Sequence, residues 1–167
     1  MEEMNQPPEE DIARWQTFID AANAFTMARR DLFVDGRSSL VELIRAGLDQ
    51  PGERYYAIDL VSLLKEEERK QLFSDLLSLA GSYDSSMGIA RNLILELPRQ
   101  WVLEIVEEKA EPLLRDGTYE EYRGILQLYL ELDQSLTYKL ARRAAEHSDP
   151  DIKEAGEDFL ETLDHQP

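Results

Sequence analysis

The chain has 167 residues, 43% of them hydrophobic, which is enough for one substantial core and favours a single domain over residues 1–167. With 35 acidic and 18 basic residues, its formal net charge is −17, so its summed field repels phosphate backbones and anionic lipid headgroups. It has no cysteine, which excludes disulfides, thiolate nucleophiles and cysteine-ligated metal sites. We therefore expect neither nucleic acid nor membrane among its partners.

The first residues, MEEMNQPPEE, lack the basic and apolar segments of a signal peptide, and no apolar run reaches the ~18 residues that a membrane span needs. These features predict a cytoplasmic protein. Residues 1–8 are expected to be disordered, because they are terminal and end in two prolines. A helix over 9–30 follows. Its apolar residues near one face are Ile12, Trp15, Ile19, Ala22 and Phe25.

The rest of the chain has apolar residues at spacings of three and four, which is typical of amphipathic helices. The predicted fold class is therefore all-α. Eight further helices are expected, over residues 38–48, 53–64, 66–82, 84–97, 98–114, 118–132, 133–147 and 149–163. Pro112 should kink or split the helix over 98–114, since it removes an amide donor and crowds the preceding turn. Asp149 and Pro150 suit the N-cap and first position of the last helix.

Four of these segments share one register, at intervals of 33, 32 and 33 residues. They are AIDLVSLL from Ala57, ARNLILEL from Ala90, YRGILQLYL from Tyr122 and AGEDFLETL from Ala155. The equivalent apolar positions within them are Val61, Ile94, Leu126 and Phe159. A fixed period of this length is typical of stacked units that cannot cover their own apolar faces alone. A generic helical bundle could produce the same spacing by chance.

The last segment, DPDIKEAGEDFLETL, resembles the second helix of a HEAT repeat, with Asp-Pro at the turn, Ile152 and Lys153 after it, and Ala155 and Leu160 facing inward. The close resemblance covers residues 148–163 only. It implies a HEAT/armadillo-like α-solenoid, an α-α superhelix of about four helical hairpins behind an N-terminal capping helix. The implied hairpins pair residues 38–48 with 53–64, 66–82 with 86–97, 98–114 with 118–132, and 133–147 with 149–163. The resemblance concerns an architecture and carries no activity.

No pattern in the chain indicates catalysis. It lacks a Gly-x-Ser-x-Gly elbow, a Gly-rich phosphate loop and a dinucleotide fingerprint. One helix face with four carboxylates could bind Mg²⁺ or Ca²⁺ weakly, although a charge-patterned surface is the simpler interpretation. These carboxylates are Glu104, Glu107, Glu108 and Glu111. His147 suits a helix C-terminus and His165 lies in the terminal tail. We predict no enzyme activity, no cofactor and no catalytic or metal site.

The HEAT resemblance implies that the second helix of each hairpin lines the concave side of the stack. The outward residues of these helices form a ladder that becomes more acidic towards the C-terminus, and it predicts a binding surface for a basic protein partner. The ladder comprises Tyr56, Asp59, Asn92, Glu96, Glu120, Glu121, Arg123, Gln127, Glu154, Glu157, Asp158 and Glu161. Alternatively, these residues are only the polar faces of amphipathic helices, and the acidity serves solubility.

The general profile, short, acidic and without catalytic motifs, resembles that of bacterial immunity proteins, which block the active site of a cognate toxin. It favours a non-enzymatic module that binds a basic partner protein and, on this resemblance, inhibits it. Two alternatives stay open. One is an adaptor or scaffold subunit, similar to the HEAT-type subunits of chromophore lyases. The other is a HEAT-like DNA glycosylase, which an acidic groove disfavours.

Overall fold

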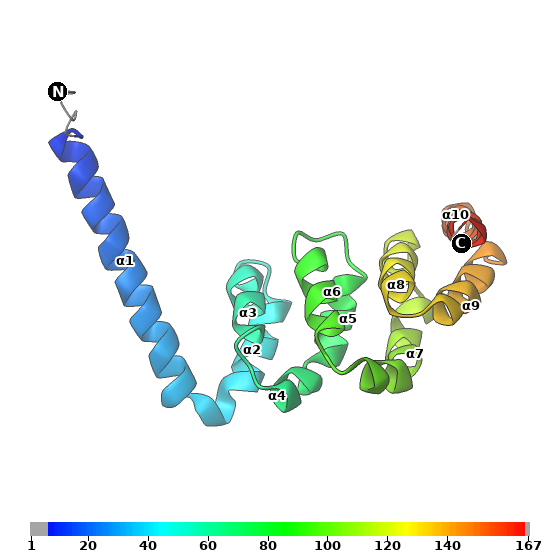
Figure 1. Cartoon of the computed structure of the whole chain (residues 1–167), viewed down its shortest axis with the longest axis horizontal. Coiled ribbons are helices and arrows are strands. Elements are labelled where there is room, and N and C mark those ends of the chain that lie inside the picture. The colour runs from blue at the N-terminus through cyan, green and yellow to red at the C-terminus, as the bar shows by residue number, and fades with distance from the viewer. Residues whose placement is uncertain (1–6, 166–167) are drawn as a thin grey trace. The chain divides into compact units, whose positions relative to one another are not determined.

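The computed structural model of the chain describes residues 7–165. These residues form ten α-helices and one 3₁₀ helix, and none of them lies in a strand, so the predicted all-α class is confirmed (Figure 1). The chain divides into two units, Met1–Glu42 and Leu43–Pro167. Of the segment 1–8, predicted to be disordered, residues 1–6 lie outside the described part.

The first unit is built on one long helix, α1 (Glu9–Val34), which is followed by the 3₁₀ helix η1 (Arg37–Ser39) and the start of α2 (Leu40–Asp49). α1 begins directly after Pro8, and three acidic residues in its first turn complement the positive end of the helix dipole. No residue of α1 is buried, and Trp15 in its apolar stripe is 62% exposed. A capping role for this helix stays a prediction.

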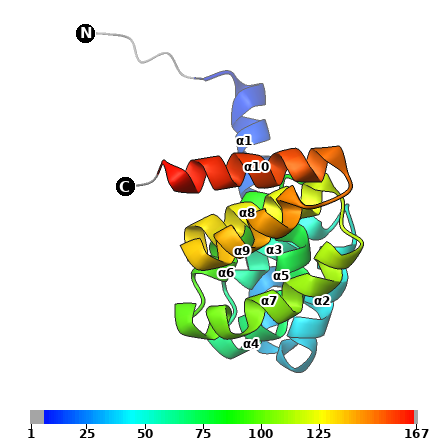
Figure 2. The ribbon, with the colours of Figure 1, turned by 90° about the vertical axis from the view of Figure 1, so that its right-hand side faces the viewer.

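The second unit begins at Leu43, within α2. Its further helices are α3 (Arg54–Val61), α4 (Glu66–Gln71), α5 (Phe73–Ala80), α6 (Met87–Leu95), α7 (Arg99–Arg115), α8 (Tyr119–Leu132), α9 (Gln134–Ala145) and α10 (Pro150–Asp164). As predicted, α5 packs on α6, α7 on α8, and α9 on α10, while α8 also contacts α6 and α10 in the neighbouring pairs. Figure 2 shows α8, α9 and α10 next to one another.

Two predicted helices differ from the observed ones. The helix over 66–82 is broken at Leu72, whose backbone leaves helical values (φ −97°, ψ 8°). The bend lets the charged α4 stay at the surface, while α5 buries five of its eight residues. Of the kink or split predicted at Pro112, the split is wrong, because α7 continues to Arg115, and the kink stays a prediction. Pro112 is exposed, and the buried Ala110 and Leu114 hold the last turn of α7 against the core.

The positions aligned by the predicted register lie in the core of the second unit. The four predicted apolar positions and the four residues that begin the aligned segments are each at most 7% exposed. They are Ala57, Val61, Ala90, Ile94, Tyr122, Leu126, Ala155 and Phe159. The two residues that each helix contributes lie four apart, about one helical turn, so they share one face. Each of these four helices therefore places the same two aligned positions in the core.

Glycines allow two helices to approach their neighbours at backbone distance. A Cβ atom added to Gly124 of α8 would lie 2.6 Å from the carbonyl oxygen of Ala80 in α5. A Cβ added to Gly156 of α10 would lie 2.6 Å from the carbonyl oxygen of Ala141 in α9. Both distances are below van der Waals contact, so only glycine fits at these positions. The close contacts fix the positions of α8 and α10, which form the groove described below.

Basic side chains link each helix pair to the next. Arg91 of α6 donates a 2.6 Å hydrogen bond to the side-chain oxygen of Gln127 in α8. Arg143 of α9 lies 2.6 Å from a carboxylate oxygen of Glu111 in α7. Further ion pairs of this kind are Arg45–Asp75, Arg54–Asp84, Lys139–Glu107 and Arg123–Asp158. Each pair is partly exposed and stabilises little on its own, but together these contacts set the spacing between helix pairs.

Gly156→Ala is expected to lower the free energy of unfolding by about 1–3 kcal/mol, because the added methyl group has no room between α10 and α9. Gly88 in α6 is the matched control, since no atom lies within 4 Å of a Cβ added there. Gly88→Ala should leave stability unchanged or raise it slightly through helix propensity. Urea unfolding of both variants checks the prediction. Equal effects at the two positions would contradict the close contact of α9 and α10.

Acid should weaken the fold through Asp84. The amide and hydroxyl of Ser86 donate to this carboxylate at 2.7 and 2.8 Å, and Arg54 lies 2.6 Å away. These bonds lower the pKa of Asp84 from its usual 3.8 to about 2. A pKa that is lower in the folded state contributes stability above the unfolded-state pKa, and this contribution is lost as the pH falls through the folded-state value.

We therefore expect the free energy of unfolding to fall between about pH 4 and pH 2. Asp84→Asn should lose less stability over this range than the wild type, because it no longer takes up a proton on unfolding. Asp59→Asn, at an exposed position in α3, should follow the wild type. Urea titrations at several pH values measure the slopes, and the same slope for wild type and Asp84→Asn would refute the assignment.

Candidate functional site

A groove runs between α8 and α10 in the second unit. It consists of two hollows of about 530 and 210 Å³, which share Arg123 and Asp158. From α8 it is lined by Tyr119, Arg123, Gln127 and Leu130. From α10 and the residue that follows it, the lining comprises Asp151, Glu154, Ala155, Asp158, Phe159, Glu161, Thr162 and His165. We call this site the α8–α10 groove.

Both walls result from helical spacing and from well-defined helix starts. On α8 successive lining residues lie three or four apart, and on α10 Asp151, Ala155, Asp158 and Thr162 repeat at the same spacing, so each wall follows one face of its helix. α10 begins at the predicted N-cap, where Asp149 accepts hydrogen bonds from the amides of Asp151 and Ile152 at 2.9 and 3.2 Å. α8 begins with a capping box formed by Thr118 and Glu121. These caps fix which side chains face the groove.

The groove is acidic around one cation. Asp151, Glu154, Asp158 and Glu161 supply four carboxylates, whereas Arg123 is the one arginine or lysine in the lining. The Arg123 guanidinium lies 3.6 Å from Asp158 and 5.7 Å from the centre of the Tyr119 ring. Leu130 and Phe159 add apolar surface to the lining. Arg123 thus offsets one carboxylate, and a surplus of negative charge lies beside an apolar patch.

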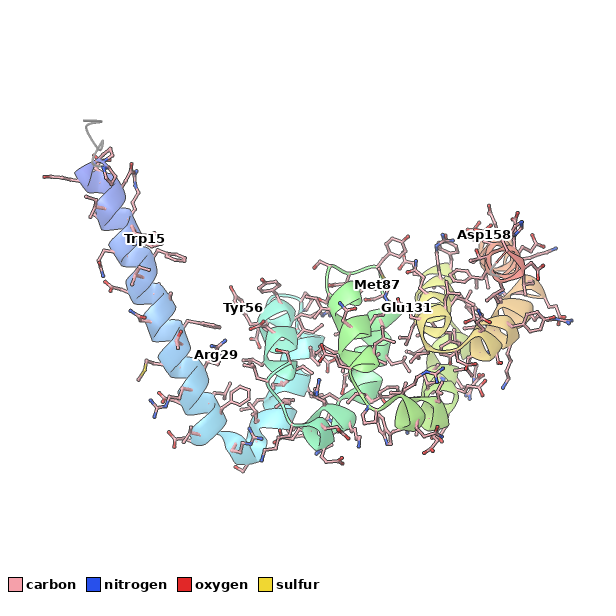
Figure 3. All side chains as sticks on the ribbon, in the orientation of Figure 1. Trp15, Arg29, Tyr56, Met87, Glu131 and Asp158 are labelled. Carbon is pink, nitrogen blue, oxygen red and sulfur yellow. The ribbon has the colours of Figure 1, made fainter. Side chains whose placement is uncertain are left out.

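Five residues of the predicted ladder lie together in this groove. They are Arg123, Gln127, Glu154, Asp158 and Glu161. The side-chain oxygen of Gln127 already accepts a hydrogen bond from Arg91, which ties this wall to α6. Figure 3 labels Asp158, whose side chain on α10 is 56% exposed despite its contact with Arg123. The predicted surface is thus concentrated at its C-terminal end, between the last two helix pairs.

The N-terminal part of the ladder lies outside the groove. Tyr56 is 60% exposed on α3, where its ring meets that of Tyr55 edge-on at 5.6 Å (Figure 3). Asp59 and Asn92 are exposed on α3 and α6. Glu96, directly after α6, forms a 2.9 Å ion pair with Arg69 of α4. The Glu96 carboxylate is therefore engaged within its own helix pair.

The remaining ladder residues have local contacts or none within the described structure. Glu121 accepts the backbone N–H of Thr118 at 2.7 Å and so belongs to the cap of α8. Glu157 lies 3.8 Å from Lys153, one turn earlier on α10. Glu120 is exposed on α8 and does not line the groove.

Sequence reasoning missed several lining residues. Leu130 follows Gln127 by three positions and Tyr119 precedes Arg123 by four, so helical spacing from the ladder could have identified both. His165 was assigned to the terminal tail. Its Nδ1 lies 2.7 Å from the carbonyl oxygen of Glu161, which holds the ring at the end of the groove. The sequence signal for His165 is its distance of seven residues, about two turns, from Asp158.

A second hollow, of about 400 Å³, lies between α7 and α9 and contains part of the carboxylate face considered as a cation site. There Glu107 and Glu111 each form a 2.6 Å ion pair, with Lys139 and Arg143 respectively. The hydrogen bond from Arg143 lowers the pKa of Glu111, and burial raises the pKa of Tyr129. The charges of this hollow are matched locally, in contrast to those of the α8–α10 groove.

In the described part of the chain, no three histidine or acidic side chains gather as a metal site would require. None of the helices over residues 7–165 combines the length and the apolar character needed to cross a bilayer. Comparison of the chain with protein-family models, with curated proteins and with solved structures finds no match.

Proposed function

We propose that this chain is a non-enzymatic, HEAT-like binding module that receives a basic protein partner in the α8–α10 groove. The observation that carries the proposal is the acidic wall of α10, which presents carboxylates on successive turns beside apolar surface. Glu154 and Glu161 are exposed, and neither forms an ion pair with a described residue. They are therefore available to a ligand.

The groove suits lysine and arginine side chains in particular. The aliphatic part of such a side chain can pack on Leu130 and Phe159 while its cation meets Asp158 or Glu161. Negative charge concentrated in a concave site also steers a basic protein towards it and raises the association rate at low ionic strength. A carboxylate of the partner can pair with Arg123, and this ion pair would fix the position of the partner along the groove.

Three features support a HEAT-like architecture for the second unit. The repeat interval is regular, consecutive helices pack as pairs, and the same two positions of each repeat are buried. On the resemblance to bacterial immunity proteins, the module would inhibit its partner by covering a basic active-site surface. The expected complex in the native host is a tight, salt-sensitive 1:1 complex with the product of a neighbouring gene.

An adaptor role is the second candidate, and one observation favours it. Tyr55 and Tyr56 on α3 are 70% and 60% exposed, and they lie outside the α8–α10 groove. Exposed aromatic pairs are frequent anchors in protein interfaces, so a second partner could bind at α3. A DNA glycosylase is disfavoured, since phosphates would face the carboxylates of the groove.

The proposal is tested with a synthetic helical peptide rich in lysine and arginine. The wild type should bind it at low salt, and affinity should fall as ionic strength rises. The combined change Glu154→Lys, Glu157→Lys and Glu161→Lys should weaken binding at least about tenfold, through the loss of Coulomb attraction. The melting temperature should hardly change, because none of the three side chains links helix pairs. Calorimetric titration and thermal unfolding measure the two effects.

The control variant changes the net charge equally at exposed sites on α7 and after α9. It combines Glu104→Lys, Glu108→Lys and Glu146→Lys, whose glutamates make only local contacts. This variant should keep most of the peptide affinity. Equal loss in both variants would show that binding follows net charge rather than the groove, and it would refute the proposal. Equal loss of affinity and stability in the groove variant would show that these residues hold the fold.

A further inference from the structure

The long helix of the first unit carries an apolar stripe that the rest of that unit cannot cover. Ile12, Trp15, Phe18 and Phe25 are between 47% and 62% exposed. Besides α1, the helical elements in the described residues 7–42 are the three residues of η1 and the start of α2, which are too short to cover a helix of 26 residues. The rings of Trp15 and Phe18 stack on each other at 5.6 Å. Trp15, Phe18 and Phe25 share one helix face, with Ile12 at its edge, and large apolar side chains on one face are typical of a helix that packs against another.

Two opposite charges lie on the same face, one near each end of the stripe. Arg29 follows Asp11 by 18 residues, which is five turns of about 3.6 residues, so both lie on one side of α1. Figure 3 shows Trp15 and Arg29 projecting from the same side. The Arg29 guanidinium lies 5.7 Å from the centre of the Phe25 ring, within the stripe. Asp11 lies 2.9 Å from Arg14 of its own helix, an exposed ion pair that a second arginine can share.

We propose that α1 pairs with α1 of a second copy of this chain, with the two helices antiparallel. In this arrangement the stripes cover each other, and Asp11 of each protomer faces Arg29 of its partner. A parallel pair would place Asp11 against Asp11 and Arg29 against Arg29, which is repulsive. The antiparallel pair also aligns opposite ends of the two helix dipoles. This dimer involves the first unit only and does not depend on the function proposed for the groove.

The antiparallel register also matches large side chains with complementary ones. When Asp11 faces Arg29, the pair is centred on residue 20, so Trp15 of one protomer lies opposite Phe25 of the other, and Phe18 lies opposite Ala22. Along the helix pair, an aromatic ring therefore faces another ring at Trp15 and Phe25, and a ring faces a small side chain at Phe18 and Ala22. Alternating sizes of this kind allow two helices to interdigitate.

The test is the mass of the full chain in solution, measured by sedimentation equilibrium from about 1 μM to about 1 mM. The wild type should reach twice the monomer mass. Asp11→Arg or Arg29→Asp alone places like charges opposite each other at both ends, and each should weaken dimerisation at least about tenfold. The variant that carries both changes restores the attraction and should dimerise like the wild type. Single variants that leave the dimer intact would refute the antiparallel arrangement.

Trp15→Arg should abolish the dimer, whereas Thr17→Arg, on the opposite side of α1, should not. Circular dichroism of each variant checks that the helices remain folded. A wild type that stays monomeric up to the highest concentration would overturn the proposal, as would a dimer that Trp15→Arg leaves intact. A monomeric wild type whose melting temperature falls with Trp15→Arg would show that the stripe is covered by its own chain.

Discussion

The second unit depends on one constraint, which is that its helices bury their apolar faces in a core that they share with neighbouring helices. Leu126 of α8 and Phe159 of α10 are buried at equivalent positions of successive pairs, as are Val61 and Ile94 earlier in the chain. Because a glycine brings α10 to backbone distance from α9, the last pair is held closely together. The α8–α10 groove exists because its two walls belong to different pairs that meet through this core.

The large acidic surplus has two separate roles within this framework. Carboxylates such as those of Asp84 and Glu111 form ion pairs with arginines of the neighbouring helix pair, so their charge contributes to the spacing of the helices. On α10, Glu154 and Glu161 have no such partner among the described residues. Other acidic residues, such as Asp59 and Glu120, also lack an ion pair among the described residues, but in the groove such carboxylates line a hollow together.

The sequence predicted most of the fold because periodicity reports which residues of a helix share a face. Periodicity predicts Val61, Ile94, Leu126 and Phe159 as equivalent apolar positions, and all four are buried. The break at Leu72 and the absence of a split at Pro112 differ from the prediction, since both depend on how these segments pack and not on spacing alone. For the site, spacing indicated the acidic face of α10. It could not show that Glu96 bonds to Arg69, because that depends on how two helices pack.

Arg123 and Asp158 connect the two walls of the groove, and these walls lie on helices of neighbouring pairs. Packed helices that meet through side chains move most easily by small sliding or rotation against one another. The opening of the groove is therefore governed by the angle between α8 and α10. A ligand that contacts both walls would restrict the motion of α10 relative to α8. Binding would then reduce the flexibility of the C-terminal helices even if their average conformation did not change.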